Sequence, residues 1–215
     1  MHVGRRTAIV GVLLGAAAYA VVIDRIAVIA GNSIIKDSDI ERNIRVTSFL
    51  NDERPSFSVA SRKTAANRLL DQIFIRREIQ DGDYPVANLE QAEEQLAALK
   101  RNRYRTDGSY ERAVEADGIT DVDLRIEFQW QLTVLRFIDI RFKPAVLVSD
   151  EDVQKYYRAH VEALRRAHPG DASFEDVKAE IQNTLTGERV NQQFFSWLDE
   201  QRKNEKIRYL EEGLQ

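Results

Sequence analysis

The chain has 215 residues, a formal net charge of −4, 43% apolar residues, 31% charged residues and no cysteine. Its length allows one large domain or two small ones, and its mild acidity gives no general attraction to nucleic acid or anionic lipid. Without cysteine there is no disulfide, thiolate nucleophile or cysteine-based zinc site. The only histidines, His2, His160 and His168, are too scattered in the sequence to predict a metal site.

The N-terminus has the pattern of an export signal. Arg5 and Arg6 precede an uncharged, mostly apolar run over residues 7–23, which contains Ala18 and Ala20 in an A-x-A cleavage pattern. The run is also at the lower limit of the length that spans a bilayer. We therefore expect a cleaved signal peptide, with an uncleaved membrane anchor as the alternative. Either one would carry the rest of the chain across a membrane.

A hairpin and a capped helix are predicted next. Two short apolar strands, the first over residues 26–30, flank a Gly31–Asn32 corner, which is a recognised hairpin signal. A capping box follows, with the hydroxyl of Ser38 at the cap and the carboxylate of Glu41 three residues later. The helix that it begins is expected to end near Leu50.

Helical spacing dominates the remainder, so the predicted class is mainly α. Residues 51–58 are expected to form a loop, and residues 81–83 a turn rather than a calcium loop. Further helices are expected from about Ala65, Asn88, Tyr110, Thr120, Ser149 and Ser173, and a last strand at Ile207–Leu210.

Residues 122–134 carry conflicting signals. Apolar and polar residues alternate strictly, which favours a strand, but the segment continues without a breaker to Phe142, far beyond usual strand length. We predict a helix with two apolar stripes on nearly opposite faces. We assign one stripe to the core: Leu124, Phe128, Leu135, Ile138 and Phe142. The other contains Ile126, Trp130, Val134 and Phe137.

Several segments, taken in order, resemble SurA-type periplasmic chaperones. The resemblance is piecewise, spans nearly all of residues 21–215, and lies in the order of the segments rather than in any strict motif. The segments are "IDRIAVIAGNSIIKDSDIERNI", "SRKTAANRLLDQIFIRREI", "ADGITDVDLRIEFQWQLTVLRFIDIRF", "VSDEDVQKYYRAH" and "SFEDVKAEIQNTLTGERVNQQFFSWLDEQRKNEKIRYL".

The resemblance implies a single helical SurA-like chaperone core over residues 21–215, following a signal peptide or short membrane anchor at residues 1–20. It also implies a small β element in which the N-terminal hairpin pairs with a C-terminal strand. The expected location is the periplasm, or the periplasmic side of the inner membrane if the anchor is retained.

The chain departs from the family at its catalytic domain. Family members usually carry a parvulin-type prolyl isomerase domain, which needs on the order of 100 residues, after a segment like "VSDEDVQKYYRAH". Here only residues 161–172 separate that segment from the last helix. We therefore expect no isomerase domain and no enzymatic activity; residual isomerase activity is the weakest alternative.

The expected function is that of an ATP-independent holdase for unfolded outer-membrane or secreted polypeptides. The sequence has no phosphate-binding G-x-x-x-x-G-K-[ST] loop, and we expect no cofactor, metal or nucleic-acid partner. Ile126, Trp130 and Phe137 are the predicted client-binding residues, the alternative being that both stripes are buried. A membrane-anchored assembly or structural factor with one fixed partner is the second hypothesis.

A basic run at the end of the third expected helix has two interpretations. Its cations, interleaved with Tyr104, could contact phosphate, but we favour a solvated helix end where positive charge opposes the dipole. The residues are Lys100, Arg101, Arg103 and Arg105.

Overall fold

The computed structural model describes residues 24–168 and 173–214. Within these ranges the protein is mainly α-helical with one small antiparallel sheet, as predicted. The signal region predicted at residues 1–20, with Ala18 and Ala20, lies outside the described residues. The elements are β1 (Ile26–Ala30), β2 (Ser33–Lys36), α1 (Asp37–Leu50), α2 (Val59–Asp81), α3 (Leu89–Arg103), α4 (Ser109–Asp117), α5 (Asp121–Arg141), η1 (Lys143–Ala145), α6 (Asp150–Ala167), α7 (Phe174–Asn204), β3 (Ile207–Tyr209) and η2 (Glu212–Leu214).

The sheet joins the two ends of the described chain. Its strand order is β2-β1-β3, and both pairings are antiparallel. Gly31 turns the β1–β2 hairpin with a φ of 56°, a conformation that glycine adopts without strain. Val28 and Ala30 of β1 lie opposite Tyr209 and Ile207 of β3. The pairing expected between the hairpin and the C-terminal strand is therefore confirmed.

A cluster of charges, which we call the clasp, fastens the C-terminal segment to the helices. Arg62 on α2 donates to both carboxylate oxygens of Glu211, at 2.9 and 2.7 Å, and to Asp37 at 2.9 Å. The hydrogen bond from Arg62 holds the pKa of Glu211 below its ordinary value. Leu214 follows directly and is almost fully buried among the side chains beneath the sheet.

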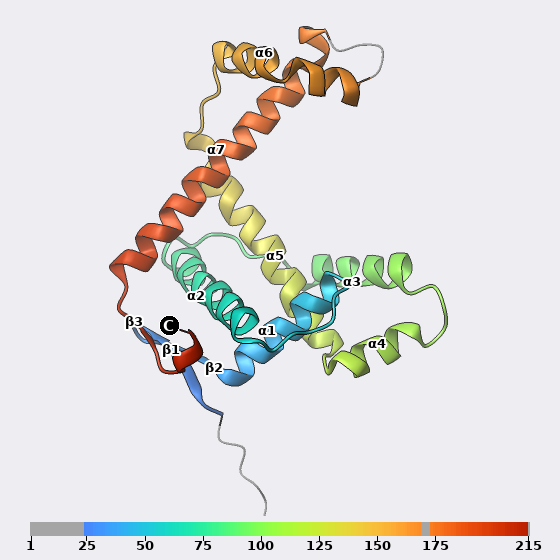
Figure 1. Ribbon diagram of the computed structural model, residues 1–215, viewed down its shortest axis with the longest axis vertical. Helices are drawn as coiled ribbons and strands as arrows, with labels where there is room; N and C mark the ends of the chain where they lie inside the picture. The colour runs from blue at the N-terminus through green and yellow to red at the C-terminus, as the bar shows by residue number, and fades with distance from the viewer. Residues whose placement is uncertain (1–23, 169–172, 215) are drawn as a thin grey trace, which may run out of the picture.

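The helices form a body and a projecting arm (Figure 1). In the body, α1, α2 and α5 lie at the centre, α3 and α4 lie to one side, and α7 runs diagonally from the sheet to α6 at the far end. Three apolar clusters fill the body: under the sheet, among α2, α5 and α7, and among α1, α3, α4 and α5. A fourth cluster joins only α6 to the first half of α7, so the arm has a small core of its own.

Most predicted helix caps are confirmed, with one error of register. Asn88, Thr120 and Ser149 each accept a hydrogen bond from a backbone N–H of the following turn. The expected Ser38–Glu41 capping box is wrong, because β2 leads directly into α1 and Lys36 occupies the N-cap. The carboxylate of Asp39 accepts from the Lys36 N–H at 2.9 Å, while the hydroxyl of Ser38 donates to Asp24.

Residues 122–134 are helical, as predicted, but the assignment of the two stripes is wrong along the middle of α5. Leu124 and Phe142, at the ends of the stripe assigned to the core, are buried, whereas Leu135 at its centre is 62% exposed. Phe137 of the opposite stripe is fully buried. The reason is that α5 contributes to two clusters on different sides: its first turn packs against α1 and α4, and its second half packs against α2 and α7.

Candidate functional site

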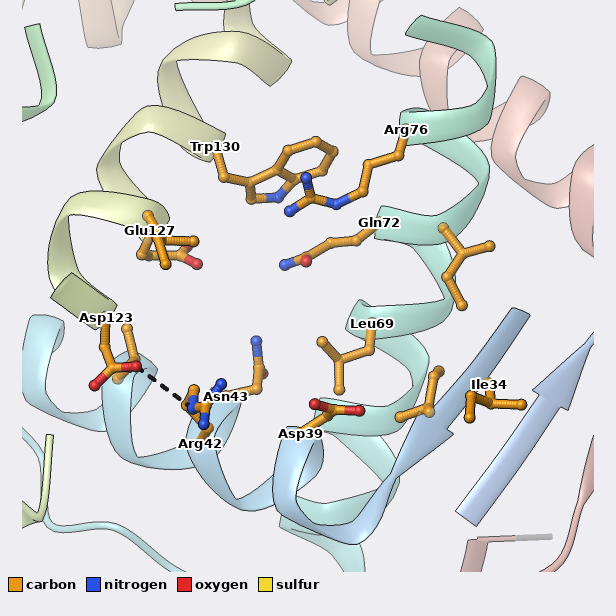
Figure 2. A pocket seen from close by; sticks show the side chains of 14 residues that line it. Ile34, Asp39, Arg42, Asn43, Leu69, Gln72, Arg76, Asp123, Glu127 and Trp130 are labelled. Carbon is orange, nitrogen blue, oxygen red and sulfur yellow. Dashed lines mark ion pairs between the residues drawn. The ribbon is translucent and has the colours of Figure 1, made fainter. Parts of the chain in front are cut away.

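A polar groove opens between α1, α2 and α5 beside strand β2 (Figure 2). Its volume is about 310 Å³, at the lower end of the roughly 300–1,000 Å³ range of ligand clefts. Each helix contributes four residues at the spacing i, i+3, i+4 and i+7, which places them on one face. They are Asp39, Arg42, Asn43 and Val46 of α1, Leu69, Gln72, Ile73 and Arg76 of α2, and Asp123, Ile126, Glu127 and Trp130 of α5.

Two amide side chains point into this groove (Figure 2). Asn43 is only 8% exposed. Its Oδ1 accepts from Arg68 at 2.7 Å, and Arg68 also donates to Thr47 at 2.9 Å. This contact turns the Nδ2 of Asn43 toward the groove, where it has no partner among the described residues. The amide of Gln72 projects into the groove from α2 and likewise has no hydrogen-bond partner within the described chain.

The charged residues of the groove are mostly engaged in local contacts. Arg42 bridges α1 to α5 through an ion pair of 3.4 Å with Asp123, drawn as the dashed line in Figure 2. Asp123 also accepts from the backbone and hydroxyl of Thr120 as the capping residue of α5. The groove therefore has mixed charge rather than the single strong sign that would attract phosphate or a metal ion.

Trp130 lies at the end of the groove, beneath a cation. The guanidinium carbon of Arg76 is 4.1 Å from the centre of the indole, within the range of a cation–π contact. Although Arg76 reaches solvent, desolvation of its guanidinium lowers its pKa, and the nearby carboxylate of Glu127 opposes that shift. The Arg76–Trp130 pair presents a flat, partly apolar surface at the end of a polar groove.

A second, apolar hollow lies on the other side of Trp130, between α2, α5 and α7, and has a volume of about 430 Å³. Two large apolar side chains on its wall are open to solvent: Leu135, and Phe195 at 60% exposure. The other apolar lining residues are Ile75, Trp130, Val134, Phe194 and Leu198. On its polar rim, Asp71 accepts two hydrogen bonds of 2.8 Å from Arg202, which ties α2 to α7.

The three predicted client-binding residues have different environments in the structure. Ile126 is exposed and lines the groove, as a binding residue should. Trp130 is mostly buried but lines both hollows, so a bound molecule reaches only part of its ring. Phe137 is wrong as a contact residue, because it is enclosed by rings that include Tyr84 and Phe142, at centroid distances of 5.1 and 5.7 Å.

Sequence reasoning missed Leu135, Phe195, Asn43 and Gln72. Leu135 was assigned to the core, and Phe195 lies beside the buried Phe194 in a helix that reads as apolar on several sides. The quartets that line the groove are visible in the sequence as helical spacing. However, polar residues at that spacing also describe any solvated helix face, so the signal was not specific.

The basic run at the end of α3 is solvated, as expected, with Arg101, Arg103 and Arg105 exposed and Lys100 half-buried, but two of its cations also have partners in other elements. Lys100 pairs with Asp121 at 2.8 Å, and Arg103 donates to the carbonyls of Phe49 and Leu50 at 2.7 and 2.8 Å. Arg103 therefore neutralises the C-terminal end of α1 rather than that of its own helix. Among the described residues, no group of three or more histidine or acidic side chains is placed to hold a metal ion.

Comparison of the sequence with models of protein families and with characterised proteins gives no match. The resemblance to SurA-type chaperones therefore stays a prediction. In the part of the chain that the structure describes, no helix has the length and apolar character needed to cross a bilayer.

Proposed function

We propose that the protein is an ATP-independent chaperone that holds unfolded exported polypeptides in the periplasm, including outer-membrane proteins. The observation that carries this proposal is the apolar hollow, where Leu135 and Phe195 are both more than half exposed although they come from helices distant in the sequence. Contiguous apolar surface of this kind marks an interaction site on a soluble protein.

The polar residues around the apolar hollow suit a client that binds and is then released. Arg68, Asp71, Glu127 and Gln131 surround the apolar residues of the hollow. A polar rim keeps the chaperone soluble while the centre covers a client's apolar side chains. Because the hollow is shallow and open, each contact is weak, and clients can be released without an energy source.

The proposal does not include catalysis or nucleotide use. The sequence lacks a phosphate-binding loop and has too little chain between α6 and α7 for an isomerase domain. The periplasmic location rests on the pattern in residues 1–20 and on the family resemblance. A membrane-anchored factor with one fixed partner is the competing hypothesis.

An aggregation assay with matched variants tests this function. The chain without residues 1–20 should suppress aggregation of several unrelated, chemically unfolded proteins without ATP, and the double variant Leu135→Ser/Phe195→Ser should lose most of this activity. Leu147→Ser is the control, because Leu147 is 84% exposed but lines neither hollow. Suppression by the double variant equal to that of the control, or activity toward a single protein only, would contradict the proposal.

A further inference from the structure

The polar groove ends at an open strand edge. Ile34 and Ile35 are neighbours in β2 and both line the groove, although successive side chains of a strand point to opposite faces of the sheet. Figure 2 shows β2 between the groove and β1, so the groove lies beside β2 on the side away from β1. The other edge of β2 is covered by β1, so the groove runs along the free edge.

The hydrogen-bond pattern shows which main-chain groups face that edge. Gly31 donates to the carbonyl of Lys206, and Leu210 donates to the carbonyl of Ala27. In an antiparallel ladder the bonding direction alternates from residue to residue, so Ile29, between these two positions, bonds toward β3. Its partner on β2, Ile34, therefore directs its N–H and C=O away from β1 and toward the groove.

We propose that the polar groove binds the main chain of an extended client segment, which pairs with Ile34 at the free edge of β2. This inference rests on the proposed function and names the form in which a client is held. An extended backbone is the occupant that matches an open strand edge, because each of its residues offers one donor and one acceptor.

The two amides on the groove walls fit the same occupant. Asn43 and Gln72 each carry donors and an acceptor like those of a peptide group, and they enter the groove from two neighbouring helices, α1 and α2 (Figure 2). The Nδ2 of Asn43 has no hydrogen-bond partner among the described residues, although the residue as a whole is only 8% exposed. This donor is open to the groove rather than enclosed, so a bound molecule can reach it. A carbonyl of the client supplies the missing acceptor.

The neighbouring apolar residues receive the client's side chains. Leu69, Ile73 and Ile126 line the groove between the amides and Trp130. A paired strand presents alternate side chains to one side, so every second residue of the client faces these residues. Only Ile34 of β2 offers both main-chain groups, since the N–H of Lys36 already caps α1. The pairing is therefore short, sequence-tolerant and readily reversed.

The test compares main-chain with side-chain effects. The probe is a short fluorescent peptide of alternating threonine and valine, and its partner is the same peptide N-methylated at its central peptide nitrogens. Anisotropy titrations with the chain lacking residues 1–20 should show binding of the first peptide and binding of the methylated peptide at least about 10-fold weaker, since more than one hydrogen bond is lost.

Variants of the protein locate the pairing. Ile34→Pro, which removes the outward N–H, and Gln72→Leu should each weaken binding about 2- to 10-fold, the loss expected for one hydrogen bond. Ile34→Ala, which keeps that N–H but loses apolar surface of the groove, should bind more tightly than Ile34→Pro. Gln154→Leu on the exposed face of α6 is the control and should stay within about twofold of wild type. If circular dichroism shows that Ile34→Pro is unfolded, Gln72→Leu decides the result.

Equal affinity for the two peptides would overturn the inference, as would wild-type affinity of the folded Ile34→Pro or Gln72→Leu variant. Sedimentation provides a separate check, because a dimer that Ile34→Pro dissociates would assign the edge to a second copy of the chain. If aggregation is suppressed while methylation has no effect, the main-chain site is wrong and the proposed function stands. If neither peptide binds and aggregation proceeds, both proposals fail.

Discussion

Trp130 separates two hollows of different chemistry. On the side of α1 and β2, the groove presents amides, an open strand edge and paired charges. On the side of α7, the hollow presents Leu135 and Phe195 inside a polar rim. The first suits the main chain of a polypeptide and the second suits its apolar side chains. One unfolded segment offers both, and under the proposed function the two hollows act as complementary subsites for it.

The largest expected effect comes from emptying a core site beneath α5, the helix that lines both hollows. Phe137 packs beneath the second half of α5 with Trp197, at a centroid distance of 5.7 Å. Phe137→Ala should lower the free energy of unfolding by about 3–5 kcal/mol, the cost of emptying a fully buried aromatic site. Leu135→Ala, by contrast, should change it by less than about 0.5 kcal/mol.

Urea unfolding followed by circular dichroism measures both variants. If the two substitutions lowered the free energy of unfolding equally, Leu135 would belong to the core, as the assignment of the stripes predicts. The apolar hollow would then not be an exposed surface. The contrast between a polar groove and an apolar hollow on the two sides of Trp130 would then no longer hold.

A smaller effect is expected at the clasp, which holds the sheet beside the polar groove. Because folding lowers the pKa of Glu211 below its ordinary 4.5, the clasp stabilises the fold above that pH. The contribution is lost as the pH falls through the lowered pKa. Glu211→Gln should destabilise the protein by about 1 kcal/mol at pH 7, a figure discounted because Glu211 is partly exposed.

Unfolding measured at pH 7 and pH 3 should give a difference between wild type and Glu211→Gln that shrinks at the lower pH. The variant should also bind the alternating peptide more weakly while retaining the apolar hollow. A difference between the two proteins that stays constant across this pH range would show that the carboxylate charge of Glu211 does not stabilise the fold.

Gly187 offers a stabilising change outside both hollows. It lies within α7, between the arm cluster and the body cluster, and an added Cβ would meet no atom within 4 Å. Gly187→Ala should raise the free energy of unfolding by about 0.5–1 kcal/mol, since alanine favours a helix more than glycine does.

Gly187→Ala changes neither hollow, so it should keep wild-type peptide binding and aggregation suppression. When a binding-site substitution is added to this stabilised protein, a loss of binding can be separated from a loss of folding. A melting temperature below that of the wild type would show that α7 needs the flexibility of glycine at this position.

Much of the fold was predictable because local signals agree with the final structure. The hairpin follows from Gly31–Asn32, and the extent of α5 follows from the Thr120 cap and the absence of a breaker before Phe142. The exposure of Leu135 was not predictable. Periodicity says which residues share a face of a helix, but not which neighbour covers that face at each turn, and α5 changes neighbours along its length.

The candidate site was less predictable than the fold. Ile126 and Trp130 were predicted as contact residues because apolar residues beyond the needs of one core face suggest a surface, and the structure places both on the lining of the groove. Asn43 and Gln72 were not, because an amide on a helix has no distinctive pattern. Their role depends on Arg68 holding Asn43 and on β2 ending beside α1, contacts that only the folded chain brings together.

Site-specific photocrosslinking tests the central claim most directly. A photoreactive phenylalanine analogue placed at Leu135, and in a control protein at the more exposed Leu147, is irradiated with a permanently unfolded probe such as reduced and alkylated lysozyme. We predict strong crosslinking from position 135 that an excess of a second unfolded protein competes away, and little crosslinking from position 147. Equal crosslinking from the two positions, or none at position 135, would contradict the assignment of the apolar hollow as a client-binding surface.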